Sequence, residues 1–201
     1  MTGPPRGRLI VIEGIDGTGK SMLVAALARA LSSGGVDAAT SAEPTDGRHG
    51  RKIRELAATG RHNVTPQQEA ELFLLDRRDH VDQVIKPALA AGRTLILDRY
   101  YYSTMAYQGA RGLDPAQIEQ RNRAFAPEPD LLVILELPVQ EALERITQKR
   151  GSAPDHFEGE AYLEKVDQGF KTIHHPSMLR LDARASTEEM VGRILAGLER
   201  A

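Results

Sequence analysis

Cysteine is absent from this chain of 201 residues. The chain therefore cannot form a disulfide, bind a metal through thiolates or use a cysteine nucleophile. Long apolar runs are absent as well, and none approaches the length of a membrane span. The segment 1–8 is polar and rich in glycine and proline, without the apolar stretch of a signal peptide. We expect a cytoplasmic protein with a frayed start and no membrane partner.

Neither sign of charge is in large excess, because 26 lysines and arginines stand against 28 aspartates and glutamates. Proteins that bind nucleic acids usually carry a clearly basic face, so we expect no nucleic acid partner. A local basic pocket for phosphates remains compatible with this balance. The length and the 41% hydrophobic content fit a single globular domain over residues 1–201.

Short apolar runs alternate with segments whose apolar residues recur at helical spacing. Strands are predicted at residues 8–13, 36–41, 94–97, 131–137 and 178–181. Helices are predicted at residues 20–33, 48–59, 65–91, 138–149, 157–173 and 186–198. Thr65 with Gln68, and Ser186 with Glu189, have the spacing of a capping box. The alternation predicts an α/β three-layer sandwich, with a mostly parallel five-stranded sheet covered by helices on both faces.

A glycine-rich loop follows the first predicted strand. Residues 14–21, GIDGTGKS, fit the phosphate-loop pattern G-x-x-x-x-G-K-[ST] at every fixed position. The glycines let backbone N–H groups converge on an anion at a helix N-terminus, Lys20 can reach the β- and γ-phosphates, and Ser21 is the expected Mg²⁺ ligand. The motif predicts binding of a nucleoside triphosphate with Mg²⁺ and leaves the acceptor open. The residues expected to bind ATP are Gly14, Asp16, Gly17, Thr18, Gly19, Lys20, Ser21 and Met22.

Four segments together resemble thymidylate kinases: residues 12–21, 43–54, 72–78 and 97–114. The last, LDRYYYSTMAYQGARGLD, meets the family's D-R-[YH]-x-x-S-x-x-A-[YF]-x-G pattern. The resemblance implies a P-loop NTPase fold with a short lid, and transfer of the ATP γ-phosphate to dTMP in dTTP biosynthesis. It also implies that nucleotides are the partners and that the chain forms a homodimer on its long helix.

The predicted catalytic groups lie in the loop, at a strand end and beside the lid. Asp98 and Arg99 end a parallel strand, where open sheets bind ligands. Arg99 offers a phosphate a bidentate fork, and Asp98 can hold Mg²⁺, its waters or the arginine, although a surface ion pair is the alternative. By resemblance, the lid spans about 150–157, and Arg150 rather than a loop arginine neutralises the transferring phosphate, with Lys149 as its competitor. The expected catalytic residues are Asp16, Lys20, Arg99 and Arg150.

The acceptor site is assigned by the same resemblance. Phe73 is expected to stack on the thymine ring, and Arg77, four residues on, to bind the base or the monophosphate. Their alternatives are a core phenylalanine and a solvated helix arginine. Tyr107 is expected to pack under the deoxyribose and exclude a 2′-hydroxyl. The remaining substrate contacts are expected from Asp16 at the 3′-hydroxyl and from Glu43, Arg99, Ser103 and Gln108.

Three positions depart from the family pattern. Met22 stands where Thr or Ser is usual, Ala42 where Arg is common, and His156 in place of a lid arginine. Ala42 and His156 leave room for a related deoxynucleotide or nucleoside kinase with another acceptor. A nucleotide-dependent switch is a further alternative, although the guanine-reading N-K-x-D motif is missing. The pair at 174–175, two histidines before a proline, is expected to end a helix rather than bind a metal.

Overall fold

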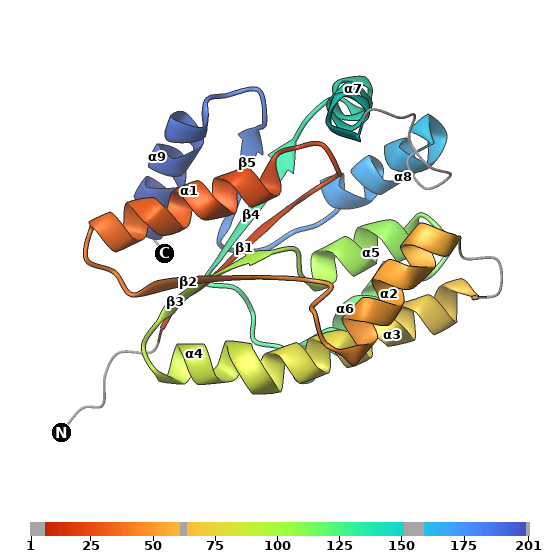
Figure 1. Ribbon diagram of the computed structural model, residues 1–201, viewed down its shortest axis with the longest axis horizontal. Helices are drawn as coiled ribbons and strands as arrows, with labels where there is room; N and C mark the ends of the chain where they lie inside the picture. Colours follow the sequence, from red (N-terminus) through yellow and green to blue (C-terminus); the bar gives the residue numbers. More distant parts are fainter. Residues whose placement is uncertain (1–6, 61–63, 151–158, 200–201) are drawn as a thin grey trace.

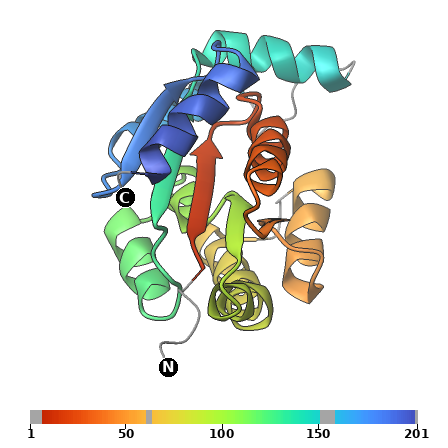
Figure 2. The same ribbon diagram turned by 90° about the vertical axis from the view of Figure 1, so that its left-hand side faces the viewer.

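The structure of the chain, a computed structural model, describes residues 7–60, 64–150 and 159–199 (Figure 1). Five parallel strands form one sheet in the order β2-β3-β1-β4-β5. They are β1 (Leu9–Gly14), β2 (Ala38–Ala42), β3 (Thr94–Asp98), β4 (Leu131–Glu136) and β5 (Met178–Asp182). Figure 2 shows β1, in red, between β3 and β4. The predicted α/β fold is confirmed, and the sheet is parallel throughout.

Helices cover both faces of this sheet (Figure 1). The described helices are α1 (Lys20–Ser33), α2 (Arg48–Thr59), α3 (Pro66–His80), α4 (Lys86–Ala90), α5 (Tyr101–Gly109), α6 (Pro115–Arg123), α7 (Val139–Arg150), α8 (Glu160–Lys171) and α9 (Thr187–Leu198). Helices α1 and α9 lie on one face, and α4 and α5 lie on the other. None of these helices is long and apolar enough to cross a membrane, within the part of the chain that the structure describes.

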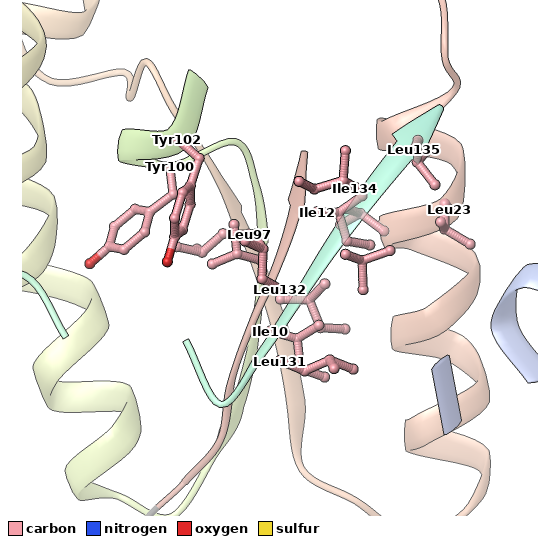
Figure 3. Packing of buried hydrophobic residues seen from close by; sticks show 14 of the residues in the cluster. Ile10, Ile12, Leu23, Leu97, Tyr100, Tyr102, Leu131, Leu132, Ile134 and Leu135 are labelled. Carbon is pink, nitrogen blue, oxygen red and sulfur yellow. The ribbon is translucent and has the colours of Figure 1, made fainter. Parts of the chain in front are cut away.

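The core lies between the central strands and these helices. Figure 3 shows apolar side chains of β1 and β4 reaching toward Leu23 of α1 on one side, and Tyr100 and Tyr102 on the other. Ile10, Leu132 and Tyr100 are fully buried. Burial of each leucine or isoleucine side chain contributes about 1.5–3 kcal/mol to the stability of the fold. The core therefore holds the carboxyl ends of the strands in fixed positions.

The predicted helix over 65–91 contains an interruption. Residues Val81–Ile85 form a π-helical segment, η1, which joins α3 to α4. The capping box at Thr65 is present in full, whereas Ser186 makes half of its box by accepting a hydrogen bond from the Glu189 amide. The sequence did not predict α5 and α6. The helix predicted from residue 157 begins at Glu160, and residues 157–158 lie outside the described part.

Candidate active site

The phosphate loop connects β1 to α1 and closes on itself through Lys20. The Lys20 ammonium donates to the carbonyl oxygens of Gly14 at 3.0 Å and Ile15 at 2.9 Å. The Thr18 hydroxyl donates to the same Ile15 carbonyl at 2.9 Å. Burial, together with the nearby charge of Arg99, lowers the pKa of Lys20 to about 8. The ammonium is therefore held inside the phosphate loop. It loses its proton at a lower pH than an ordinary lysine does.

Gly17 brings the loop against α7. Its φ of +85° is a left-handed conformation that glycine adopts without strain. A Cβ atom at this position would also lie 2.5 Å from the backbone oxygen of Ala142. The space beside residue 17 is thus filled by α7, and a side chain as long as arginine has no room to leave the loop on this side.

Ser21 and Asp98, the two predicted metal ligands, are in direct contact. The Ser21 hydroxyl at the start of α1 donates to the Asp98 carboxylate at the end of β3, at 2.5 Å. The contact follows from the sheet order, because β3 is hydrogen-bonded to β1, which leads into the loop. A hydroxyl and a carboxylate are hard oxygen ligands of the kind that Mg²⁺ prefers. The donor set therefore fits the predicted metal.

Asp16, Arg99 and Tyr107 form a second cluster across the loop. The Arg99 guanidinium lies 2.5 Å from the Asp16 carboxylate and donates to the Ser103 hydroxyl at 2.9 Å. The Tyr107 hydroxyl donates to the other Asp16 oxygen at 3.1 Å. Burial opposes ionisation of Asp16, but the charges of Arg99 and Lys20 outweigh it and hold the pKa of Asp16 below its usual range. The structure thus brings three predicted site residues together.

Glu13, which was not predicted from the sequence, holds this cluster in place through hydrogen bonds to Tyr100 and Ser103. Its carboxylate accepts from the Tyr100 amide at 2.7 Å, the Ser103 amide at 3.0 Å and the Ser103 hydroxyl at 2.6 Å. These bonds hold the start of α5 directly after Arg99, which adopts a left-handed φ of 72°. Burial raises the pKa of Glu13, against the lowering effect of Arg99. A carboxylate ending an apolar strand was the signal available in the sequence.

A cavity of about 820 Å³ opens beside the phosphate loop. Its lining includes the predicted residues from Asp16 to Met22, together with Asp98 and Arg99. The lining also includes residues that the sequence did not mark as part of the site: Arg145, Ile146, Ala183, Arg184, Ala185, Ser186, Thr187 and Met190. The Arg145 guanidinium donates to the Ala183 carbonyl at 3.1 Å, which joins α7 to the loop after β5. That loop follows β5 and therefore starts at the carboxyl edge of the sheet, where ligands bind in such folds. Its place after a predicted strand is the sequence signal that could have identified it as part of the site.

Arg77 is buried, so it is not the solvated helix arginine considered from the sequence. Only 1% of the residue is exposed. Its Nε donates to the Glu43 carboxylate at 2.8 Å, and Nη2 lies 2.7 Å from the same carboxylate oxygen. Nη2 also donates to the Thr104 hydroxyl at 3.2 Å, and Nη1 donates to Asn122 at 2.8 Å. Glu43 is thus a partner of Arg77, and its direct contact with substrate stays a prediction.

Phe73 lies on α3, the helix that carries Arg77, and Gln108 lies on α5. The Gln108 amide nitrogen donates to Glu69 at 3.3 Å, whereas its buried carbonyl oxygen Oε1 has no hydrogen-bond partner among the described residues. Phe73 is partly exposed and is not a member of the hydrophobic core cluster. This disfavours the interpretation of Phe73 as a core residue. Tyr101 and Tyr102 pack in the core.

The lid prediction falls largely outside the described residues. His156 and the rest of 151–158 are not described, and Lys149 and Arg150 end α7 without described side chains. His175 accepts a hydrogen bond from the Ser177 amide at 3.2 Å, in the turn between α8 and β5.

Comparison with known proteins agrees with this arrangement. The family model for thymidylate kinase matches residues 12–194. A thymidylate kinase of Akkermansia muciniphila is 51% identical over 198 residues, covering 98% of this chain and 94% of that protein. One from Desulfotalea psychrophila is 47% identical over 184 residues, covering 92% and 90% respectively. One from Brachyspira hyodysenteriae is 40% identical over 190 residues, covering 94% and 92%. The chain belongs to the thymidylate kinase family.

Proposed function

We propose that this chain transfers the γ-phosphate of ATP to dTMP, giving ADP and dTDP. Family membership supports the reaction class. The observation that carries the choice of acceptor is a pair of buried polar groups, on Arg77 and Gln108, that have unused hydrogen-bonding capacity. The whole chain, 1–201, would act as one catalytic unit, with residues 150–157 as its lid.

The unused groups match the edge of a thymine ring. A guanidinium has five N–H donors, and in Arg77 one hydrogen on Nη1 has no acceptor among the described residues. Gln108 Oε1 supplies an unused acceptor. Gln108 lies one helical turn after Thr104, which contacts Arg77, so Gln108 is on the same face of α5 as that contact. Thymine presents O4, an acceptor, next to N3–H, a donor, and cytosine reverses both.

The sugar and phosphate of dTMP would lie along the Asp16 cluster. Asp16 would accept from the 3′-hydroxyl, and the ring of Tyr107, which lies under the Arg99 guanidinium at 5.2 Å, would leave no space for a 2′-hydroxyl. Arg99 would bind the acceptor phosphate, held in position by Ser103 and Asp16. Phe73, partly exposed on α3, would stack on the base.

Phosphoryl transfer needs no covalent intermediate with the protein. An oxygen of the dTMP phosphate attacks the γ-phosphorus, and the bond from that phosphorus to the β,γ-bridging oxygen breaks, releasing ADP. Lys20 and Arg99 would both stabilise the charge on the transferring group. Ser21 and Asp98 would hold Mg²⁺, which neutralises phosphate charge when bound. The part of the cavity lined by Arg145 would take the nucleoside of ATP.

We propose that the lid arginine is Arg150, as in bacterial-type members of the family. The packing of Gly17 against Ala142 supports this, because it leaves no room for an arginine in the loop itself. Helix α7 packs against Gly17 through Ala142 and ends at Arg150. The helix that leaves no room for an arginine at position 17 therefore carries Arg150 itself.

A homodimer formed on the helical stretch from Pro66 to Ala90 is also proposed. Val84 in η1 is 40% exposed, and Leu72 and Leu75 in α3 are partly exposed, so these helices retain apolar surface for a partner. Sedimentation of the wild-type chain and a Val84→Lys variant tests this. We expect a dimer that the variant weakens, and a wild-type monomer at micromolar concentration contradicts it.

One observation favours a second candidate, a kinase of a different deoxynucleotide. Ala42 is exposed at the end of β2, in register with Asp98, where the family commonly has an arginine. Of the nearby cations, Arg51 donates to the Asp46 carbonyl and Arg54 to the Pro44 carbonyl. The acceptor phosphate would then rely more on Arg99.

Product analysis tests the proposed reaction. Purified protein, ATP, Mg²⁺ and dTMP are incubated and the nucleotides are separated. We expect ADP and dTDP in equal amounts. ADP with free phosphate and no dTDP would contradict the proposal and favour a nucleotide-hydrolysing switch.

A further inference from the structure

A buried polar chain extends from Arg77 away from the proposed base site. The Glu43 carboxylate, which binds Arg77 through one oxygen, accepts from His80 Nδ1 at 2.9 Å through the other. His80 Nε2 lies 2.8 Å from the Ser41 hydroxyl in β2. Arg77, Glu43 and His80 are each 5% exposed or less. The position of Arg77 is therefore connected to β2 through two side chains that water cannot reach.

The partners of His80 define the direction of these hydrogen bonds. An ionised carboxylate can only accept, so Nδ1 carries the hydrogen that points to Glu43. In the neutral ring Nε2 is then an acceptor, and the Ser41 hydroxyl donates to it. Glu43 is held from two sides, by Arg77 and by His80. Without His80, the carboxylate would be held by Arg77 alone, and the geometry of that contact would be less fixed.

The π-helical segment explains how His80 faces this chain. His80 and Val81 are adjacent and both buried, and the next buried residues are Ile85 and Leu89. In a regular α-helix, steps of four residues drift by about 40° each. The wider segment η1, which begins directly after His80, absorbs that drift. Val81 and Ile85 can then stay on the core while His80 points to Glu43. Such segments are frequent at functional sites.

We propose that His80 is a positioning residue for recognition of the acceptor base. It acts through Glu43 to aim the unused Nη1 hydrogen of Arg77 at the ring, and it has no contact with the described phosphate-binding residues. The inference rests on the proposed dTMP kinase activity. Loss of the Nδ1 donor should therefore weaken dTMP binding and base discrimination, and leave ATP binding intact.

Two isosteric substitutions separate the ring nitrogens. An Asn amide can occupy the place of Nδ1 and still donate to Glu43, whereas a Gln amide reaches the place of Nε2 and leaves Glu43 without that donor. For His80→Gln we expect the KM for dTMP to rise about tenfold, as one hydrogen bond to a charged group is lost. The dTMP-to-dCMP preference should fall with it, while the KM for ATP should stay within about twofold. His80→Asn keeps the bond to Glu43 and loses only the Ser41 contact. Its KM for dTMP should therefore rise by no more than about threefold, and its base preference and KM for ATP should stay near wild type.

The control is His175→Gln, because His175 bonds within its own turn at Ser177. It should change neither KM. Equal effects of His80→Asn and His80→Gln would overturn the proposal, as would a parallel rise of both KM values with a lower melting temperature. If His80→Gln does not fold, Ser41→Ala carries the test, because it removes the far end of the chain and leaves every Arg77 contact. We then expect a rise of about threefold in the KM for dTMP alone, and an unchanged value overturns the proposal.

The controls also separate this inference from the activity it rests on. A wild-type protein that does not phosphorylate dTMP removes the proposed function. A wild-type protein that does so, with an unaltered His80→Gln variant, removes only the role of His80.

Discussion

The carboxylate of Asp16 lies 2.5 Å from the guanidinium of Arg99, which joins the phosphate loop to the end of β3. The two residues are 83 positions apart in the chain. Burial disfavours the charge of Arg99, but Asp16 outweighs it and keeps the pKa of Arg99 above its ordinary value. Both partners therefore stay ionised, and one ion pair borders the proposed donor and acceptor sites.

Lys20 should give the reaction an alkaline limit. Its pKa of about 8 lies below the ordinary value for lysine because of burial and Arg99. The charged form, which binds phosphate, is present below this pH and is lost as the pH rises through it. We expect kcat/KM for ATP to fall above pH 8, by about tenfold per unit. Lys20→Arg, always charged, should lack this limb, and a flat wild-type profile up to pH 9.5 would contradict the assignment.

Removing either proposed metal ligand should change the Mg²⁺ requirement. In the pair that meets at 2.5 Å, Ser21→Ala removes the hydroxyl oxygen and Asp98→Asn removes the negative charge of the carboxylate. We expect the Mg²⁺ concentration for half-maximal rate to rise in both variants, together with a lower kcat. Titration with Mg²⁺ at saturating ATP measures this. An unchanged curve for Ser21→Ala would remove that residue from the metal site.

Arg150→Ala should lower kcat far more than it raises the KM for dTMP. An arginine that stabilises charge only in the transition state behaves in this way, with effects of about 10³-fold or more. Lys149→Ala is the matched variant, one position earlier in α7. If Lys149→Ala shows the large loss of kcat and Arg150→Ala does not, the roles are exchanged.

Two glycines of the phosphate loop allow crowding to be separated from backbone strain. Gly17 and Gly19 have nearly equal φ values of 85° and 87°, but an added Cβ meets Ala142 only at Gly17. Both alanine variants should lose about 1 kcal/mol from the left-handed conformation. Gly17→Ala should lose about 1–3 kcal/mol more from overpacking. Denaturant unfolding compares them, and equal losses would show that α7 yields at this contact.

The sequence predicted the parts of the site that depend on local spacing. The phosphate loop was found because its motif places Lys20 and Ser21 at fixed offsets. Glu13 was not, because its partners Tyr100 and Ser103 are about 90 residues away. The sequence also gave no indication that Arg77 is buried, since its partner Glu43 lies on another element.

The missed helix α5 has a similar explanation. It begins at Tyr101 and Tyr102, aromatic residues that intrinsically favour strands. Both rings are buried in the core, and the Glu13 carboxylate holds the start of the helix. Tertiary packing therefore overrides the local preference, which sequence patterns alone do not show.

The ratio of kcat/KM for dTMP to that for dCMP, measured on the unmodified protein, tests the acceptor assignment most directly. Cytosine would present a donor to the Arg77 hydrogen and an acceptor to Gln108 Oε1, and such buried mismatches cost about 1–3 kcal/mol each. We predict a preference for dTMP of about tenfold to a hundredfold or more. We expect dUMP to be only slightly weaker than dTMP, since it lacks one methyl group. Equal use of dTMP and dCMP, or robust phosphorylation of AMP or GMP, would contradict the account.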